Sequence, residues 1–456
     1  MNPNRFALVS LGVLLAGVAA AAPLHTERVN VNPTTGAQAD GVSSSPAISA
    51  DGCVIAFVSQ SGTLANPSFG LTKSSPAQVY AYDRCVTPHT LELISVTNDG
   101  SAAADETCSA PNISADGRYV SFVTLSGNLP MPNSAPDNRG LFVFVRDRLN
   151  QTTSSPLEAW RVTAQVDASL SFSSGTSHRY MSGDATRFAF EFTNSATVPY
   201  NLYVFDTSGG PTTLQGICPS AAATAVEACG EAQISADGST VLFGTSYPIV
   251  AADTDGFSDV YSYDIASSTA SVISVNLDGS QPNQTVDAFG DVGLSSNGRV
   301  VAFSSVDATN FPGNTSYTML LKNLDTPALK LIGATPDGTP EFITAGIAAP
   351  QLSDDGRRVA FNSDNSALSP WLQYSVKDAL LYDQATGALH GLCVSSSGSY
   401  GTFGCDSVVL SGDGKWAAMR SVSSNLVPGD TNTNPDIFVV AVDPAADLVF
   451  ASGFEM

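Results

Sequence analysis

Two short acidic segments of this 456-residue chain carry the clearest candidate chemistry. In each, side-chain oxygens stand at offsets 0, 2 and 6: Asp253, Asp255 and Asp259 in the first, and Asp430, Asn432 and Asp436 in the second. A turn could gather such oxygens around calcium, the one cofactor that the sequence suggests, although neither segment has the twelfth-position glutamate of an EF-hand. The alternative is that these side chains form Asx turns where a strand begins. The spacing alone leaves both interpretations open.

Motifs for catalysis are missing from the sequence. The four histidines, His25, His89, His178 and His390, are dispersed, and neither a His-Glu-x-x-His nor a Gly-x-Ser-x-Gly sequence occurs. We therefore expect no enzyme activity that depends on a linear motif.

Aromatic residues in the long polar segments are candidates for binding. Phe69, Phe257, Phe311, Trp371 and Tyr374 could form a rim that contacts a protein or a glycan. Alternatively, they pack back onto the fold, because isolated apolar residues at a surface are ordinary.

A short pattern that recurs along the chain must position these residues. It consists of an apolar residue, Ser, a spacer and Asp-Gly, followed by an apolar run that ends in Phe, and three copies are nearly identical. Those copies start at Ile48, Ile113 and Ile234, and weaker copies start at Met181, Leu294, Leu352 and Leu410. The spacing between copies is 53 to 68 residues. Seven copies at such a period indicate a repeat fold.

Each copy is expected to form a four-stranded unit. Asp-Gly predicts a type I′ hairpin turn between the first two strands, and the continuously apolar second strand, as in 54–58, predicts burial on both faces. A third strand rich in Tyr or Phe ends in Asp, as in 79–83, and a fourth follows, as in 93–96. The sequence thus predicts an all-β, seven-bladed β-propeller of four-stranded blades.

The Ser-x-Asp-Gly hairpin followed by a Tyr/Phe-rich strand that ends in Asp resembles the TolB-like, WD40-like bacterial propeller repeat. The resemblance covers residues 26 to about 443. It implies the fold and says little about function, since such repeats serve as periplasmic scaffolds, as peptidase-associated propellers and in other roles.

The seven cysteines suggest three disulfides and one free thiol. Cys53 begins the second strand of blade 1 and Cys85 ends the third, so antiparallel pairing brings them within disulfide reach. The other two predicted pairs close equivalent loops between an outer strand and the next blade, with Cys218 joined to Cys229 and Cys393 to Cys405. Cys108 is predicted to be free.

The ends of the repeat array predict how the ring closes. Residues 28–36 have the pattern of a fourth strand and its turn with no inner strands before them, while the seventh blade lacks a fourth strand after 437–442. We therefore expect the N-terminal strand to pair antiparallel with 437–442 and to cover two open sheet edges. The rival candidate for this position is 448–451.

The N-terminal residues 1–21 are interpreted as a secretory signal peptide, because Arg5 precedes an apolar run that ends in small residues. Residues 24–443 would form the propeller, and 444–456 a C-terminal tail. The net charge of −23 with only 19 Lys and Arg argues against nucleic acid as a partner. No other segment is long and apolar enough to span a membrane.

These observations predict an exported, monomeric, non-enzymatic module that binds or scaffolds a protein or glycan in the cell envelope or outside the cell. The alternative is a hydrolase or lyase whose residues converge from several blades in the central channel. An apolar rim on one face would favour the binding module, and converging charged side chains in the channel would favour the enzyme.

Overall fold

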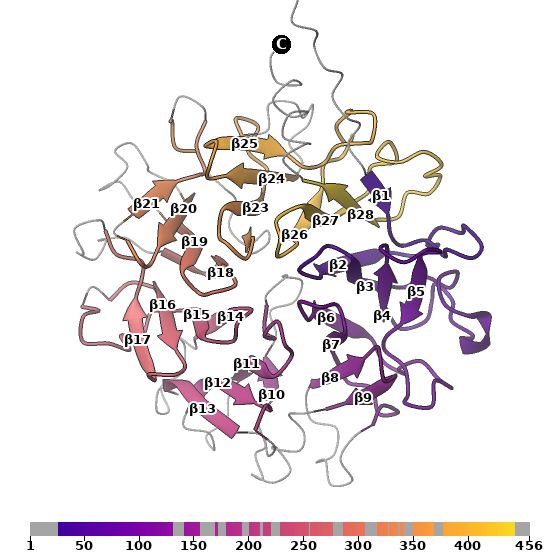
Figure 1. The fold of residues 1–456 in the computed structure, drawn as a ribbon, viewed down its shortest axis with the longest axis horizontal. Coiled ribbons are helices and arrows are strands. Elements are labelled where there is room, and N and C mark those ends of the chain that lie inside the picture. Colours follow the sequence, from indigo (N-terminus) through magenta and orange to yellow (C-terminus); the bar gives the residue numbers. More distant parts are fainter. Residues whose placement is uncertain are drawn as a thin grey trace, which may run out of the picture.

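Seven four-stranded antiparallel sheets stand around a common axis and form the ring in Figure 1. The computed structural model describes residues 26–130, 141–155, 169–171, 179–193, 200–209, 213–219, 229–254, 256–276, 286–305, 317–326, 328–335, 338–341, 350–368 and 377–442. The seven-bladed propeller that the repeats predict is confirmed. The predicted signal peptide and C-terminal tail lie outside the described residues.

The blades follow one another in chain order. The first four consist of β2 (Ser43–Ile48), β3 (Val54–Ser59), β4 (Gln78–Asp83) and β5 (Thr90–Leu93); β6 (Cys108–Ile113), β7 (Tyr119–Thr124), β8 (Phe142–Asp147) and β9 (Thr152–Ser154); β10 (Ser169–Ser171), β11 (Arg187–Thr193), β12 (Tyr200–Asp206) and β13 (Thr213–Pro219); and β14 (Gly230–Ile234), β15 (Thr240–Thr245), β16 (Asp259–Asp264) and β17 (Thr269–Val272).

The last three blades complete the ring. They consist of β18 (Val286–Leu294), β19 (Val300–Ser305), β20 (Thr318–Asn323) and β21 (Ala328–Leu331); β22 (Gln351–Leu352), β23 (Arg358–Ser363), β24 (Asp378–Asp383) and β25 (Ala388–Gly391); and β26 (Asp406–Leu410), β27 (Trp416–Ser421), β28 (Asp436–Ala441) and β1 (Thr26–Arg28). The one helix among the described residues is a 3₁₀ turn, η1 (Pro67–Phe69), in the loop between β3 and β4.

Apolar packing between neighbouring blades forms the core. All six residues of β3 are buried, and the strand uses both of its faces. Val54 packs in a cluster with Phe122 of blade 2, whereas Ile55 packs in a cluster with Val439 of blade 7. The continuously apolar second strand follows from this arrangement, since each blade is covered on both sides.

The Ser-x-Asp-Gly hairpins differ from the predicted turn type. In blade 1, Gly52 has a φ of +72°, but Asp51 does not have a positive φ, so the turn is not type I′. Gly52 N donates to Ser49 O at 3.0 Å, as in a type I turn followed by a left-handed glycine. The Asp51 carboxylate accepts hydrogen bonds from Ser49 Oγ at 2.6 Å and from Cys53 N at 2.9 Å. These bonds stabilise Asp51 in its ordinary conformation, and the Ser bond to Asp or Asn recurs in all seven copies.

The N-terminal strand closes the ring, as predicted. In Figure 1 the indigo strand β1 lies beside the yellow strand β28, and the two are antiparallel, with Arg28 opposite Phe438. The paired strand begins at Thr26, two residues before the start of the 28–36 sequence pattern. Gly36 N then donates to Asn32 O at 2.8 Å in the turn that follows. The rival segment 448–451 lies outside the described residues.

The cysteine pairing is also confirmed. Disulfides join Cys53 to Cys85, Cys218 to Cys229 and Cys393 to Cys405, while Cys108 is a buried free thiol. Each of the last two disulfides links the end of a fourth strand to the start of the next blade. The described part of the chain has no helix with the length and apolarity needed to cross a membrane.

Candidate functional site

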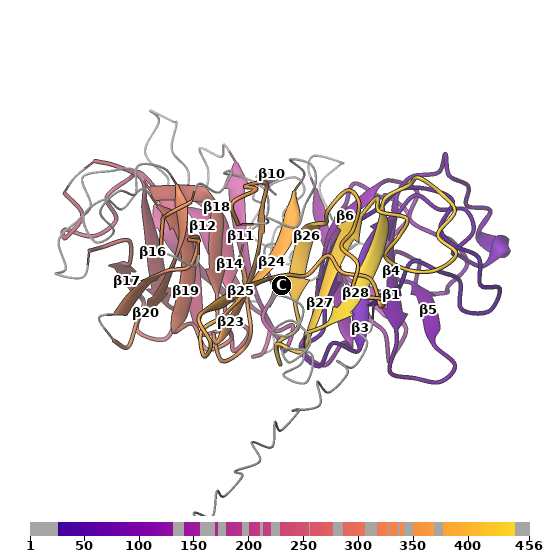
Figure 2. The same ribbon diagram turned by 90° about the horizontal axis from the view of Figure 1, so that it is seen from above.

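The two faces of the ring differ in their connections. On one, which we call the turn face, lie the hairpin turns such as Gly52 and the turns between third and fourth strands. On the other, the loop face, lie the longer connections between second and third strands, such as 60–77, and those between blades. Figure 2 shows the strands crossing the thickness of the ring between these faces.

Exposed large apolar side chains gather on the loop face. Six of the eight such side chains among the described residues adjoin strand ends on this face: Val42, Leu125, Tyr247, Phe257, Phe403 and Val422. The remaining two, Val86 and Leu149, lie on the turn face. Burial of apolar surface is the main driving force of association, so the loop face is the better candidate for contact with a partner.

A pocket of about 220 Å³ on the loop face of blade 7 includes two of these side chains. Phe403 is 57% exposed and Val422 40%. The pocket also contains an ion pair, with Arg420 Nη1 donating to Asp406 Oδ2 at 2.7 Å. Asp406 Oδ1 and Arg420 Nε are buried and have no hydrogen-bond partner within the described structure. The pocket thus combines an apolar rim with an ion pair whose Asp406 Oδ1 and Arg420 Nε are buried without a hydrogen-bond partner in the described residues.

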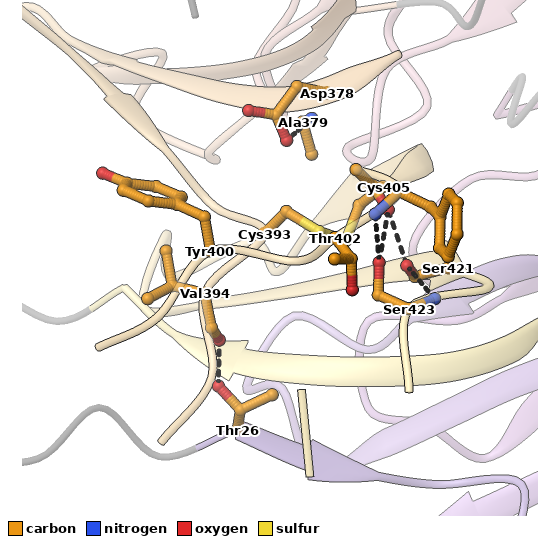
Figure 3. Close-up of a disulfide and its surroundings, with 12 residues drawn as sticks. Thr26, Asp378, Ala379, Cys393, Val394, Tyr400, Thr402, Cys405, Ser421 and Ser423 are labelled. Carbon is orange, nitrogen blue, oxygen red and sulfur yellow. Dashed lines mark hydrogen bonds between the residues drawn. A yellow bond between two sulfur atoms is a disulfide. The ribbon is translucent and has the colours of Figure 1, made fainter. Parts of the chain in front are cut away.

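The loop that carries Phe403 is held in place on several sides. The disulfide between Cys393 and Cys405 anchors its end, beside Ser421 and Ser423 in Figure 3. Ser421 Oγ donates to Gly404 O at 2.6 Å, and Phe403 N donates to Ser423 Oγ at 2.9 Å. A loop that is ordered before binding loses less conformational entropy when a partner arrives.

The first acidic segment leads into β16. Asp253 Oδ2 accepts a hydrogen bond from the Tyr261 hydroxyl. Asp259 Oδ1 accepts one from Ser274 Oγ, two residues after β17 ends. Asp255 lies outside the described residues. Calcium binding at this segment therefore stays a prediction.

The second acidic segment contacts the N-terminal strand. Arg28 Nη1 lies 3.3 Å from Asp430 Oδ1 and 3.5 Å from Asp436 Oδ2. Asn30 Nδ2 donates to Asp436 Oδ1 at 2.6 Å, and Asn432 Oδ1 accepts from the backbone of Asn434 at 2.7 Å. A cation here would have to share these carboxylates with a guanidinium. Throughout the described residues, no group of three or more His, Cys, Asp or Glu side chains is arranged to hold a metal ion.

Two residues of the predicted aromatic rim, Phe69 and Phe257, lie within the described residues. Phe69 is half-buried and packs against the core between blades 7 and 1, which matches the alternative interpretation for that residue. Phe257 is 38% exposed on the loop face. Phe311, Trp371 and Tyr374 lie outside the described residues. Phe403 and Val422 were not predicted; their position beside a disulfide-anchored loop is the signal that could have identified them.

An outer groove of about 330 Å³ separates blades 4 and 5 near the turn face. Hydroxyl groups, Asp264 and Arg299 line it, and Lys322 Nζ donates across it to the backbone oxygens of Ile273 at 2.7 Å and Val275 at 3.1 Å. Blade 2 differs, because Arg148 reaches from it to Glu92 of blade 1 with a 3.0 Å ion pair. The equivalent position of blade 5 is Leu324, an apolar residue that lines the groove.

Similarity to known proteins is found among solved structures. No protein-family model matches the sequence, and no curated protein matches it. Solved structures that match include TolB from Acinetobacter baumannii, with 15% identity and a TM-score of 0.34 over 69% of this chain and 65% of that one, so this chain spans less than two thirds of the TolB chain.

Two further structures are matched over more of this chain. The β-propeller domain of Cps50 (Swd1) from Myceliophteria thermophila has 12% identity and a TM-score of 0.46 over 89% of this chain and 97% of that one. A prolyl endopeptidase has 11% identity and a TM-score of 0.48, with 89% of this chain and 50% of that chain covered.

Proposed function

We propose that this protein is an exported, non-enzymatic propeller that binds a protein or glycan partner through its loop face. The observation that carries the proposal is the concentration there of six of the eight exposed large apolar side chains among the described residues. Apolar contacts of this kind, centred on an aromatic residue such as Phe403, are typical of protein interfaces, so a protein is the favoured partner.

The three disulfides support a location in the cell envelope or outside the cell. Disulfides persist in oxidising compartments and are rare in the reducing cytosol. The acidic composition supports a partner other than nucleic acid, since phosphate backbones are bound by clusters of Lys and Arg.

The alternative function is a hydrolase or lyase with its site in the central channel. Most glycoside hydrolases need two carboxyl groups that flank the bond to be cleaved. In the described part of the channel, the two cavities on the axis are lined by a single carboxylate, Asp354, and a single arginine, Arg179, with apolar or amide side chains and backbone around them. This lining supports the binding proposal over the enzyme.

The test compares variants on the two faces. The double variant Phe403→Ser, Val422→Ser removes the rim of the blade 7 pocket, and Leu149→Ser removes an equally apolar, 73% exposed residue from the turn face. Each variant and the parent protein would be used for affinity capture from envelope and culture-supernatant extracts, with quantitative mass spectrometry. Circular dichroism would confirm that all three are folded.

We expect the parent protein and Leu149→Ser to capture the same partner. The double variant should retain at least about tenfold less of it, because loss of the two anchors together costs about 1.4 kcal/mol or more. Equal recovery by all three proteins would contradict binding through this pocket. Loss caused by Leu149→Ser alone would place the interface on the turn face.

A further inference from the structure

Two positions of the repeat contribute residues to the channel cavities, and at each position one blade carries a charged residue. Three residues before the hairpin serine, Arg179 of blade 3 stands where the other blades have small or aliphatic residues: Pro46, Pro111, Ala232, Val292, Pro350 and Val408. One residue after the serine, Asp354 of blade 6 stands where the others have Ala50, Ala115, Gly183, Ala236, Ser296 and Gly412. Departures from an otherwise consistent pattern are expected at functional sites.

The two exceptions meet in the same part of the channel. A cavity of about 20 Å³ near the turn face is lined by both Arg179 and Asp354. A larger one, about 50 Å³ and nearer the loop face, is lined by Arg179 but not by Asp354. Arg179 is the only charged residue around the larger cavity in the described channel. The walls also include the apolar residues Ile48, Ile113 and Leu410 and the amides Asn112 and Gln351.

The Arg179 guanidinium has a hydrogen-bond donor left unsatisfied by the described residues. Its Nη1 is buried and has no hydrogen-bond partner among the described residues. Burial lowers the pKa of Arg179 from its usual value, whereas Asp354 raises it by attraction. A buried guanidinium nitrogen without a partner carries a substantial free-energy penalty, and attraction to an anion bound beside the guanidinium would offset part of it.

The turn-face end of the channel is tightly built. Backbone hydrogen bonds link the inner turns of neighbouring blades, such as Ala115 N to Gly183 O at 2.7 Å and Asp354 N to Gly412 O at 2.7 Å. Asp354 lies against Gly412, where a Cβ would be 2.4 Å from Asp354 Oδ2. A ligand of Arg179 therefore has room in the larger cavity, on the side away from Asp354.

We propose that the channel binds one small carboxylate anion in the larger cavity, with Arg179 as its main ligand. A planar guanidinium matches the geometry of a carboxylate, and the attraction is stronger in a protein cavity than in bulk water. About 50 Å³ of such space accommodates roughly four water molecules, so formate or acetate fits. Asp354 opposes binding through its negative charge and so limits the affinity.

The experiment is a titration of the purified protein with sodium formate and sodium acetate, followed by calorimetry and by thermal unfolding at constant ionic strength, with sodium chloride as the balancing salt. Butyrate and triglycine are further arms, which test the size limit and whether the carboxylate of a chain end can enter. The variants are Arg179→Gln, Arg179→Lys and Asp354→Asn, and the control is Arg299→Gln, which removes an exposed arginine outside the channel.

We expect formate to bind the parent protein and Arg299→Gln equally, and Arg179→Gln at least tenfold more weakly. Arg179→Lys retains the charge without the planar guanidinium, so it should bind formate with intermediate affinity. This variant replaces Arg179→Gln in the test if the glutamine variant does not fold. Asp354→Asn should bind about threefold more tightly or better. Absence of formate binding, equal binding by the Arg179 variants, or weaker binding by Asp354→Asn would overturn the proposal. Binding of triglycine as tight as formate would assign the site to the carboxylate of a chain end.

Discussion

Closure of the ring depends on a carboxyl group that folding buries, and stability should therefore change with pH. Asp436 is 0% exposed. Burial raises its pKa to about 6, and Asp430 raises it as well, while the hydrogen bond from Asn30 and the nearby Arg28 act in the opposite direction. The pKa of an Asp in the unfolded chain is about 3.9. Between about pH 4 and pH 6 the folded protein therefore binds the Asp436 proton more tightly than the unfolded chain does. The stabilisation is complete below about pH 4 and is lost as the pH rises through 6.

The magnitude follows from the shift. Two pKa units correspond to about 3 kcal/mol of unfolding free energy. Asp436→Asn cannot ionise and keeps an oxygen that accepts from Asn30, while Arg28 retains Asp430 at 3.3 Å. We expect the parent protein and the variant to be equally stable near pH 4, and the variant to be more stable by up to about 3 kcal/mol at pH 7.

Urea unfolding at pH 4, 5, 6 and 7 measures this difference. Asp325→Asn is the matched control, because its side chain is 59% exposed, and its stability should follow that of the parent protein across the range. A difference between the parent protein and Asp436→Asn that does not change with pH would refute the reasoning. A variant that is less stable at pH 7 would mean that the Arg28 ion pair outweighs the cost of burying the charge.

Further predictions concern the turns and the first acidic segment. Gly36→Ala should lower the free energy of unfolding in urea by about 1–2 kcal/mol, because of the positive φ alone. Gly52→Ala should lower it by roughly 1–3 kcal/mol more, because a Cβ there would also be 2.3 Å from Trp416 Cδ1. Equal costs would refute the steric contribution. Ala185, with a φ of +57°, occupies the glycine position of blade 3, so Ala185→Gly should stabilise by about 0.5–1 kcal/mol after the entropy of the unfolded chain is counted. Calcium bound at the first acidic segment should raise the thermal midpoint above that in chelator, and Asp253→Asn should abolish the difference; identical midpoints leave the Asx-turn interpretation.

Local sequence signals were sufficient for the architecture because each blade repeats them. The hairpin residues mark the start of every blade, and the two-sided burial of β3 is visible in its apolar run. The disulfide between Cys53 and Cys85 follows from antiparallel pairing of the strands that they bound. The turn type did not follow, because the Asp51 side chain competes for the hydrogen bonds that decide it.

The channel residues escape a search for linear motifs for a geometric reason. Arg179 and Asp354 belong to blades 3 and 6, and only closure of the ring brings them to the same cavity. Neither has an unusual sequence neighbourhood by itself. The signal that could have found them is a comparison of the seven copies position by position around the hairpin serine, since a charge then stands out against six small or apolar residues.

The likeness of the two acidic segments follows from their equal position in the repeat. Asp259 and Asp436 are each the first residue of a third strand, and each accepts a hydrogen bond from a residue beyond the fourth-strand ladder. For Asp259 the donor is Ser274, 15 residues later in the chain, whereas for Asp436 it is Asn30, 406 residues away. The same buried link thus holds an ordinary blade together and closes the ring. The bond between Asn30 and Asp436 can be recognised only once the N-terminal strand is known to complete blade 7. The spacing of oxygens within one segment therefore could not distinguish a structural carboxylate from a calcium ligand.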